Sequence, residues 1–218
     1  MFAFPHNIFQ YIRWAFEAIA LLCGILPGNE AIIGIGANVI ILNISSMGYM
    51  LYLGTSVAGN VRIGNALGAG DAQRAEMASN LTLGISFLMA AMNIILYISF
   101  RHHLPWLFTT DSDIAKKAEH LFLIVACFQL PDALNSAAQG IFRGSGRQAL
   151  AAIWNFVAYY CIGIPLAYVL GVTLGWGVEG LWWGLTAGLS VIAIGMTFIV
   201  VKSDWTKFSM DAKERLNC

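Results

Sequence analysis

Charged residues are scarce in this sequence. Only 11% of its 218 residues are Asp, Glu, Lys or Arg, whereas 58% are hydrophobic. A soluble domain usually carries about 25% charged residues, so a soluble fold of this size would lack the charge that its surface needs. Basic and acidic residues number 12 each, which gives a formal net charge of zero. No overall field attracts nucleic acid, and the composition indicates a membrane protein without a nucleic-acid partner.

The usual signatures of enzyme chemistry are also missing. The four cysteines are scattered without C-x-x-C spacing, so they predict neither a disulfide framework nor a metal site. The glycine-rich segment 64–70 follows a predicted helix and lacks the Lys-Ser/Thr pair of a phosphate-binding loop. The apolar segments contain no nucleophile–base pair and no set of metal ligands. We therefore expect no enzyme activity, no metal and no cofactor.

Long uncharged segments separate the few charged residues. A helix needs about 20 mainly apolar residues to cross the hydrocarbon core of a bilayer, and each uncharged segment is long enough for one helix. The predicted spans are 4–27, 32–60, 76–100, 114–142, 149–171 and 180–201. The fold class is then an all-α membrane protein, a bundle of six transmembrane helices. Residues 202–218 form a charged tail that we expect at the membrane surface.

Turns between the spans are marked by glycine, proline and polar residues. The predicted turns are 27–29, 64–71, 144–146 and 175–177, and a polar loop is predicted over 102–113. Asp71 is placed to cap the third helix at its N-terminus. His102 and His103 have no partner with ligand spacing, so we expect both to be solvated.

Lysine and arginine predict the orientation. If the first residue is cytoplasmic, most basic residues outside the spans lie on the cytoplasmic side: Arg62, Arg74, Arg143, Arg147, Lys202, Lys207, Lys213 and Arg215. Only Arg101, Lys116 and Lys117 fall on the other side. This asymmetry follows the positive-inside rule and predicts that both termini are cytoplasmic. It does not distinguish the plasma membrane from the vacuolar membrane.

Three ionisable residues lie well inside predicted spans: Arg13, Glu17 and Asp132. A charge at the bilayer centre costs at least about 2.5–3.5 kcal/mol, so such residues usually face a cavity and have a function. A carboxyl group removed from water holds a proton more readily, and two close carboxyl groups reinforce this effect. Glu17 and Asp132 are therefore candidates for a proton store or an oxygen-lined cation site. The alternative is a structural role in holding helices together.

Arg13 and several neutral polar residues are weaker candidates. Arg13 precedes Glu17 by four residues on the same helical face. It either pairs with Glu17, which would keep Glu17 deprotonated, or extends toward the cytoplasmic edge. Polar side chains within spans line a cavity or hydrogen-bond from helix to helix. The possible cavity-lining residues are Asn43, Gln129, Asn135, Asn155, Tyr159 and Arg13.

Residues 62–70, R-I-G-N-A-L-G-A-G, resemble the motif R-V-G-N-x-L-G-A-G that follows the eighth helix of one family, the multidrug and toxic compound extrusion (MATE) transporters of eukaryotes. Further matches are W-A-F-E at 14–17, L-P-G at 26–28, N-I-S-S-M-G-Y-M at 43–50, R-G-S-G-R-Q at 143–148, N-x-x-x-Y-Y-x-x-G-I-P at 155–165 and S-D-W at 203–205. Each motif alone is weak, but their order and spacing agree across essentially the whole chain.

The resemblance implies twelve helices in two lobes, of which this chain matches the second, helices seven to twelve. We therefore expect either a truncated gene product or a half-transporter that pairs with itself or with another half. Family members export organic cations, drugs or secondary metabolites in exchange for protons or sodium, and residues matching Glu17 and Asp132 bind the coupling cation. Asn43 stands where some relatives carry Glu, and Arg13 stands where an aromatic residue is usual, which puts efficient coupling in doubt.

The expected partners are membrane lipid, a small organic cation or metabolite, H⁺ or Na⁺, and the missing N-terminal lobe or a second half-transporter. Two other readings stay open. One is a transport-inactive six-helix remnant that acts only as a membrane interaction module. The other is a lipid flippase of the same superfamily, against which the motifs argue.

Overall fold

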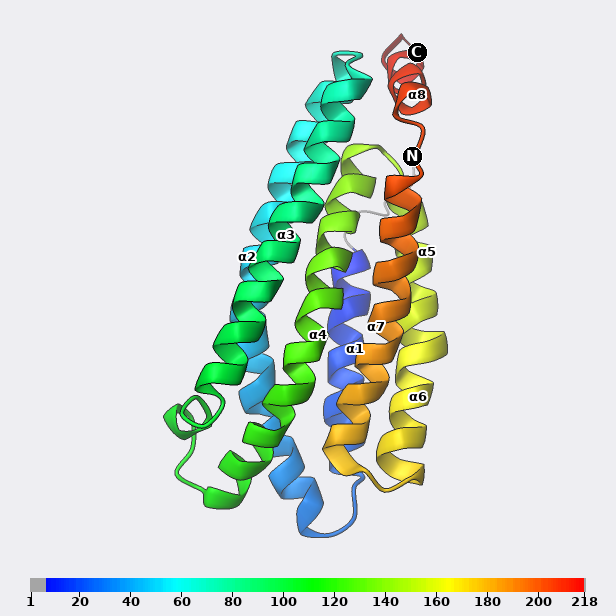
Figure 1. Ribbon diagram of the computed structural model, residues 1–218. Coiled ribbons are helices and arrows are strands. Elements are labelled where there is room, and N and C mark those ends of the chain that lie inside the picture. The colour runs from blue at the N-terminus through cyan, green and yellow to red at the C-terminus, as the bar shows by residue number, and fades with distance from the viewer. Residues whose placement is uncertain (1–6, 218) are drawn as a thin grey trace.

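The chain forms a bundle of long helices, seen in a computed structural model that describes residues 7–217 and the side chains of residues 16–214 (Figure 1). The α-helices are α1 (Asn7–Gly24), α2 (Asn29–Gly68), α3 (Ala72–Phe100), α4 (Ser112–Gly144), α5 (Gln148–Phe156), α6 (Ile164–Tyr168), α7 (Gly177–Val201) and α8 (Trp205–Asn217). A short 3₁₀ helix, η1 (Pro105–Leu107), precedes α4, and two π-helical segments, η2 (Val157–Gly163) and η3 (Val169–Thr173), follow α5 and α6. The described residues contain no strand.

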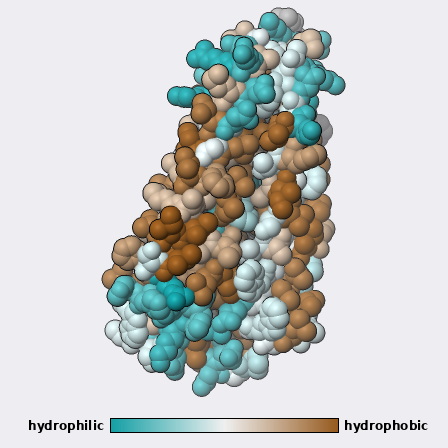
Figure 2. Space-filling model, in the orientation of Figure 1, coloured by the Kyte–Doolittle hydropathy of each residue, from teal (hydrophilic) through white to brown (hydrophobic). Residues whose placement is uncertain are grey.

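Five helical segments are long and apolar enough to cross a membrane, counted over the described residues: α2, α3, α4, the continuous segment 148–173, and α7. Figure 2 shows apolar side chains across the middle of the visible face and polar side chains at both ends. The all-helical membrane fold is therefore confirmed. The first predicted span corresponds to α1, whose 18 residues include Arg13 and Glu17. Its crossing of the membrane stays a prediction.

Helix α4 lies at the centre of the bundle. It packs against α2 and α3 on one side and against α5 and α7 on the other (Figure 1). Because neighbours surround it, its apolar side chains form much of the core, and Leu121, Phe122 and Phe128 are at most 1% exposed. The ring of Phe128 meets the buried ring of Trp182 on α7 edge to face, with centroids 5.6 Å apart. A polar residue on the buried face of α4 is therefore placed in the interior.

Helix α2 is longer than predicted. Its 40 residues give a length of about 60 Å, about twice the hydrocarbon core. The predicted loop over 64–71 is wrong for its first part, since the helix continues to Gly68. Ile63, Ala66 and Leu67 are buried, and this packing outweighs the poor helix propensity of the intervening glycines. The turn itself contains Gly70, with φ +78°.

The remaining turns follow the sequence closely. Helices end or begin at the turns predicted at 27–29, 144–146 and 175–177. Asp71 caps α3 as predicted, because its carboxylate accepts a hydrogen bond from the Arg74 N–H at 2.9 Å. The loop over 102–113 is present, interrupted by η1.

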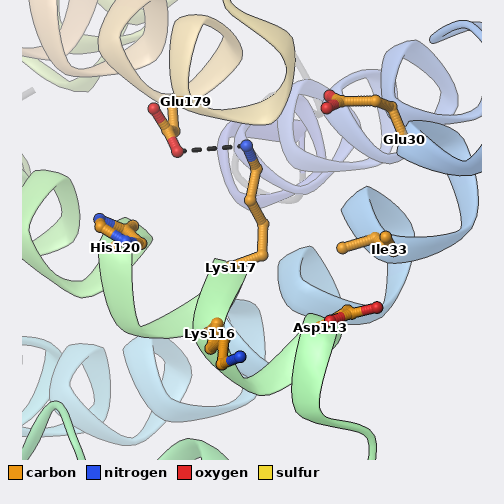
Figure 3. Close-up of a pocket in the computed structure, with 7 residues that line it drawn as sticks. All are labelled: Glu30, Ile33, Asp113, Lys116, Lys117, His120 and Glu179. Atoms are coloured by element: carbon orange, nitrogen blue, oxygen red, sulfur yellow. Dashed lines mark ion pairs between the residues drawn. The ribbon is translucent and has the colours of Figure 1, made fainter.

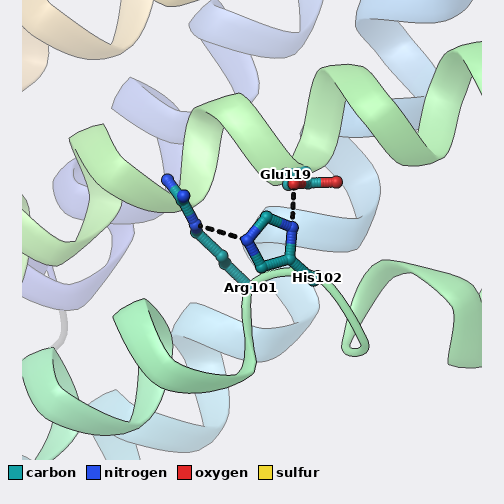
Figure 4. Close-up of polar contacts among 3 residues, drawn as sticks. All are labelled: Arg101, His102 and Glu119. Carbon is teal, nitrogen blue, oxygen red and sulfur yellow. Dashed lines mark hydrogen bonds and ion pairs between the residues drawn. The ribbon is translucent and has the colours of Figure 1, made fainter.

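His102 has partners that the sequence did not indicate. The Arg101 Nε–H donates to His102 Nε2 at 3.1 Å, and His102 Nδ1 faces the Glu119 carboxylate on α4 (Figure 4). Since Nε2 accepts, the ring proton lies on Nδ1. His102 is exposed, as expected, and its side chain also joins the end of α3 to α4.

The C-terminal tail contains a helix, which the charge count did not predict. Trp205 and Phe208 of α8 are buried, and α8 packs against α2 and α3. The guanidinium carbon of Arg147, from the turn before α5, lies 3.7 Å from the centre of the Phe208 ring. Helix α8 thus covers the end of the bundle where the α2–α3 turn lies (Figure 1).

The α6 side of the bundle approaches α7 through small residues. Gly180, Gly184 and Gly188 recur every four residues on α7 and face the segment that holds Gly163, Ala167 and Gly171. A Cβ at position 184 would lie 2.2 Å from the backbone nitrogen of Ala167. Small residues at this spacing let two helix backbones approach closely inside a membrane.

Candidate functional site

The buried face of α4 carries a row of polar side chains. Gln129, Asp132, Asn135, Ser136 and Gln139 recur every three or four residues and are all buried. Asp132 is the one charged residue in the buried set of residues 16–214, with 9% of its surface exposed. Removing a carboxylate from water is costly unless the surroundings stabilise it. The groups around Asp132 therefore decide what it can do.

On one side, α4 is joined to the helix that follows it. The Asn135 side-chain amide donates to Asn155 Oδ1 at 3.4 Å, and Asn155 donates to the Ala151 carbonyl at 2.7 Å. Tyr159, one turn beyond Asn155, is 2% exposed and lies in the π-helical segment η2. Single π turns occur frequently at functional sites. Four of the predicted site residues thus come together here, since Asp132, Asn135, Asn155 and Tyr159 face the same interior.

On the other side, tyrosines from α2 and α3 approach Asp132. Tyr49 and Tyr52 on α2, Tyr97 on α3 and Tyr159 on η2 all lie within electrostatic range of its carboxyl group. Tyrosine side chains from three segments are therefore the titratable groups in the neighbourhood of Asp132. Such side chains can donate hydrogen bonds to a carboxylate and offer aromatic faces to a cation.

Hydrogen bonds join these tyrosines to α3 and α4. The Asn93 amide donates to the Tyr52 hydroxyl at 2.8 Å, and the Tyr52 hydroxyl donates to Gln129 Oε1 at 2.8 Å. The Tyr97 hydroxyl donates to the Ile44 carbonyl at 3.0 Å. The sequence reasoning named Gln129 as a candidate but missed Tyr52 and Tyr97. The sequence contained a signal for Tyr97, because Asn93 and Tyr97 are four residues apart within one apolar span.

The other predicted site residues lie elsewhere. Glu17 is exposed on α1, and the predicted meeting of Glu17 with Asp132 stays a prediction. Asn43 is exposed on α2, and its amide donates to the Val39 carbonyl of its own helix at 2.8 Å. The side chain of Arg13 lies outside the described residues. The site as observed is therefore centred on α4, with α1 at its margin.

A polar pocket of about 480 Å³ lies at the N-terminal end of α4. It is bordered by the first turns of α2, α4 and α7 (Figure 3). Its lining residues are Glu30, Ile33, Asp113, Lys116, Lys117, His120 and Glu179. Lys117 pairs with Glu179 across α4 and α7 at 3.2 Å, and acidic side chains in first turns favour the positive helix ends. Asp132 lies about 22 Å further along α4 than Lys117, so the pocket is separate from it.

Comparison with known proteins identifies the family. The family model described as MatE matches residues 6–169, well over half of the chain. This chain belongs to the MATE family. The recognition made from the sequence motifs is therefore confirmed, and MATE proteins are integral membrane transporters that cross the membrane several times.

Named MATE relatives occur in animals and plants. The chain is 35% identical over 204 residues to Multidrug and toxin extrusion protein 1 of Homo sapiens, and this match covers 94% of the chain and 35% of the relative. It is 31% identical over 204 residues to Protein DETOXIFICATION 36 of Arabidopsis thaliana, covering 94% of the chain and 40% of the relative. The chain thus spans well under half the length of these MATE relatives.

A solved structure agrees with the fold. The crystal structure of the eukaryotic MATE transporter AtDTX14 superposes with a TM-score of 0.88 at 31% identity. The match covers 93% of this chain and 45% of that transporter. The bundle described above therefore has the architecture of about half of a MATE transporter, as a single lobe should.

Proposed function

We propose that this chain is the C-terminal lobe of a secondary antiporter that exports organic cations, drugs or secondary metabolites in exchange for protons. The observation that carries the proposal is the burial of Asp132 among tyrosines and amides at the centre of the bundle. A buried carboxylate persists in a membrane helix when it serves an ion pathway. The relatives' names, which refer to multidrug and toxin extrusion, support the direction and class of transport.

The chemistry of coupling follows from the two states of Asp132. When Asp132 holds a proton, the interior is neutral and an organic cation gains nothing from binding near it. When the proton leaves, the carboxylate attracts a cation, and nearby aromatic rings add cation–π attraction. Proton and substrate therefore compete for one charge. Such competition shifts the population of two conformations only if each ligand prefers one of them.

Glu17 supplies a second acidic group in this proposal. Its exposed position on α1 places it where the lobe meets water, lipid or another lobe. Transporters of this architecture alternate access by rocking one lobe against another around a site near the membrane midplane. Since this chain spans less than half of its curated relatives, the proposed transport cycle includes a first lobe or a second copy. Both termini are cytoplasmic in this arrangement. Sodium is the alternative coupling ion.

Transport by a two-lobe protein tests the proposal. This lobe is joined to the first lobe of a relative, and proton-driven efflux of a fluorescent organic cation is measured in vesicles. Asp132→Asn and Glu17→Gln are each expected to reduce coupled efflux at least about tenfold, which corresponds to about 1.4 kcal/mol. Asp113→Asn, which removes an acid from the separate pocket, is the matched control and retains efflux. Unchanged efflux in Asp132→Asn contradicts the coupling role.

The buried hydrogen bonds that join α2, α3 and α4 also fit a second candidate, a membrane interaction module without transport. The 218-residue chain reconstituted alone in proteoliposomes separates the two. Proton-coupled flux from this chain alone excludes the module. The module is supported if the chain alone gives no flux, associates stably with a first lobe, and still gives no transport when it is joined to that lobe.

A further inference from the structure

The buried hydrogen bonds between α3, α2 and α4 run in one direction. Asn93 donates to Tyr52, and Tyr52 donates to Gln129 Oε1, both at 2.8 Å. A phenol has one hydrogen. Since Tyr52 accepts from an amide N–H and gives its hydrogen to Gln129, its orientation is fixed. The amide oxygen of Gln129 thereby has a hydrogen-bond partner, and its Nε2 group is the end of the amide that remains available as a donor.

That Nε2 group is buried without a hydrogen-bond partner among the described residues. Gln129 is 0% exposed, so its amide hydrogens cannot reach bulk water. Asp132 follows three residues later, on the same face of α4. An unpaired donor and a buried carboxyl group thus stand one helical turn apart. A carboxylate is a stronger acceptor than a neutral carboxylic acid, because hydrogen bonds to charged groups are stronger.

We propose that Tyr52 and Gln129 are positioning residues for Asp132, with the Gln129 amide donating to the Asp132 carboxylate whenever the Asp132 proton leaves. Tyr52 holds the amide oxygen and thereby turns the nitrogen toward Asp132. Asn93 fixes Tyr52 in turn. The proton itself does not travel along this chain; each side chain keeps its own hydrogens. A change of charge on Asp132 then affects a series of hydrogen bonds that joins α2, α3 and α4.

Other atoms fill the space around the hydrogen-bonded series Asn93–Tyr52–Gln129. A Cβ at Gly48 would lie 2.8 Å from the Tyr97 hydroxyl, 2.9 Å from Asn93 Nδ2 and 3.3 Å from Gln129 Oε1. Glycine at this position lets α2 approach closely enough for Tyr52 to reach both neighbours. Tight packing also prevents the Gln129 amide from turning over freely. The geometry therefore favours one orientation of the amide.

Several titratable groups face or flank Asp132. Tyr49 and Tyr52 approach from α2, Tyr97 from α3 and Tyr159 from η2. On α4 itself, Arg143 interacts with Tyr49 about 16 Å further along the axis than Asp132. Glu17 is the other acid that the sequence places well inside a predicted span. Gln129→Leu leaves all of these groups in place, whereas Tyr52→Phe and Tyr97→Phe each remove one phenol hydroxyl.

Infrared difference spectra of the 218-residue chain in lipid nanodiscs test this inference, which rests on the proposed role of Asp132 in proton uptake. The Asp132 bands are those that disappear in Asp132→Asn. Tyr52→Phe and Gln129→Leu are expected to shift the Asp132 carboxylate band. Both are also expected to lower, about tenfold, the proton concentration at which half of Asp132 is protonated, because the charged form loses a donor. Asn93→Leu breaks the first link and shifts the band less, in the same direction.

Tyr97→Phe is the matched control. It removes one buried tyrosine hydroxyl from the same cluster, but that hydroxyl donates to the Ile44 carbonyl and not to Gln129. The thermal stability of Tyr97→Phe should fall like that of Tyr52→Phe, while its Asp132 bands shift clearly less than those of Tyr52→Phe. Equal band shifts in the two phenylalanine variants, or no shift in Tyr52→Phe, overturn the inference.

The same spectra separate this inference from the proposed function. If no band depends on Asp132 between acid and neutral pH, Asp132 does not exchange a proton, and both fail. If Asp132 titrates but Tyr52→Phe and Gln129→Leu leave its bands unchanged, only the positioning role fails. If the band shifts are as expected while Asp132→Asn keeps full coupled efflux in the two-lobe protein, the positioning role stands and the antiport proposal fails.

Discussion

Both sides of the bundle have close contacts between glycine and a neighbouring backbone, as at Gly140 against the Ser56 carbonyl, but they differ in their side-chain hydrogen bonds. On the α2–α3–α4 side, buried side chains hydrogen-bond across helices, as from Tyr52 to Gln129 and from the Ser56 hydroxyl to the Ser136 carbonyl at 2.6 Å. On the α6–α7 side, Gly184 lies directly against the backbone of Ala167. Lipid tails give helices no hydrophobic reason to associate, so both means are needed. Directional bonds place chemical groups, whereas small residues place only backbones.

This difference assigns roles to the two sides. A contact between backbones has one close-packed arrangement and responds little to charge. A hydrogen-bonded cluster around Asp132 has different preferences for the neutral and the charged carboxyl group. We therefore expect α6 and α7 to behave as one rigid unit, and α2, α3 and α4 to carry any change that depends on protonation. Four substitutions probe this division, from the largest expected effect to the smallest.

Gly184→Ala is expected to be the most damaging change, because its methyl group would meet the Ala167 backbone at 2.2–2.3 Å, which no rotamer change relieves. Overpacking of this kind costs about 1–3 kcal/mol and sometimes more. The matched control is Gly84→Ala on α3, where a Cβ meets nothing within 4 Å. Denaturation with SDS, followed by circular dichroism, measures both. Equal stability of the two variants would contradict the backbone contact.

Gly48→Ala is expected to cost about 1–2 kcal/mol. The methyl group meets side-chain atoms of Tyr97 and Asn93 at 2.8 and 2.9 Å, and these atoms can move at the expense of their hydrogen bonds. The loss should shrink in a Tyr97→Phe background, since the nearest obstacle is then gone. Thermal melts of the two single variants and the double variant measure this coupling. Strict additivity would show that the Tyr97 hydroxyl is not the obstacle.

Trp182→Phe removes a side-chain hydrogen bond that joins α7 to α2. The Trp182 Nε1–H donates to Asn38 Oδ1 at 3.1 Å, and the Asn38 Nδ2 group has no hydrogen-bond partner among the described residues. Bonds of this kind in membrane proteins contribute about 0.6 kcal/mol on average and at most about 1.7. Adding Asn38→Leu should recover part of the loss, because it removes the polar group left unpaired. A further loss of the same size in the double variant would contradict this account.

Arg147→Gln should have the smallest effect. It removes the cation over the Phe208 ring, at 3.7 Å in the structure, and such contacts at partly exposed sites contribute about 0.5–1 kcal/mol. The bundle should melt almost unchanged, while limited proteolysis cuts between α7 and α8 more readily. Phe208→Leu, which keeps an apolar contact without a ring, should give the same proteolysis pattern. Protection equal to that of the unmodified chain in both variants would show that α8 is held by other contacts.

The sequence predicted the order of the long helices well, because charge marks where most of them end. The same rule could not place α2's end, because Ile63, Ala66 and Leu67 are buried and extend the helix through a glycine-rich segment. It also gave no sign of α8. The tail is charged in composition, and its helix is held by two aromatic residues, Trp205 and Phe208.

The candidate site was predicted in part, and the reason is again physical. A charge in an apolar span is conspicuous, so Asp132 was found. The amides on α4 and α5 followed from the same logic. Tyr52 and Tyr97 were not found, because a tyrosine in a membrane helix is compatible with packing, with an interfacial position or with a polar cluster. Only the packing of three helices shows which of these applies.

Helix α2 has a mechanical consequence. It contains no proline, so no missing N–H interrupts its backbone hydrogen bonds over 40 residues. Glu30 at one end borders the polar pocket, Tyr52 lies near the site, and Gly68 ends the helix beside the part of the bundle that α8 covers. One continuous helix thus joins three separate places in the lobe. If α2 tilts as a unit about Tyr52, its two ends move in opposite directions.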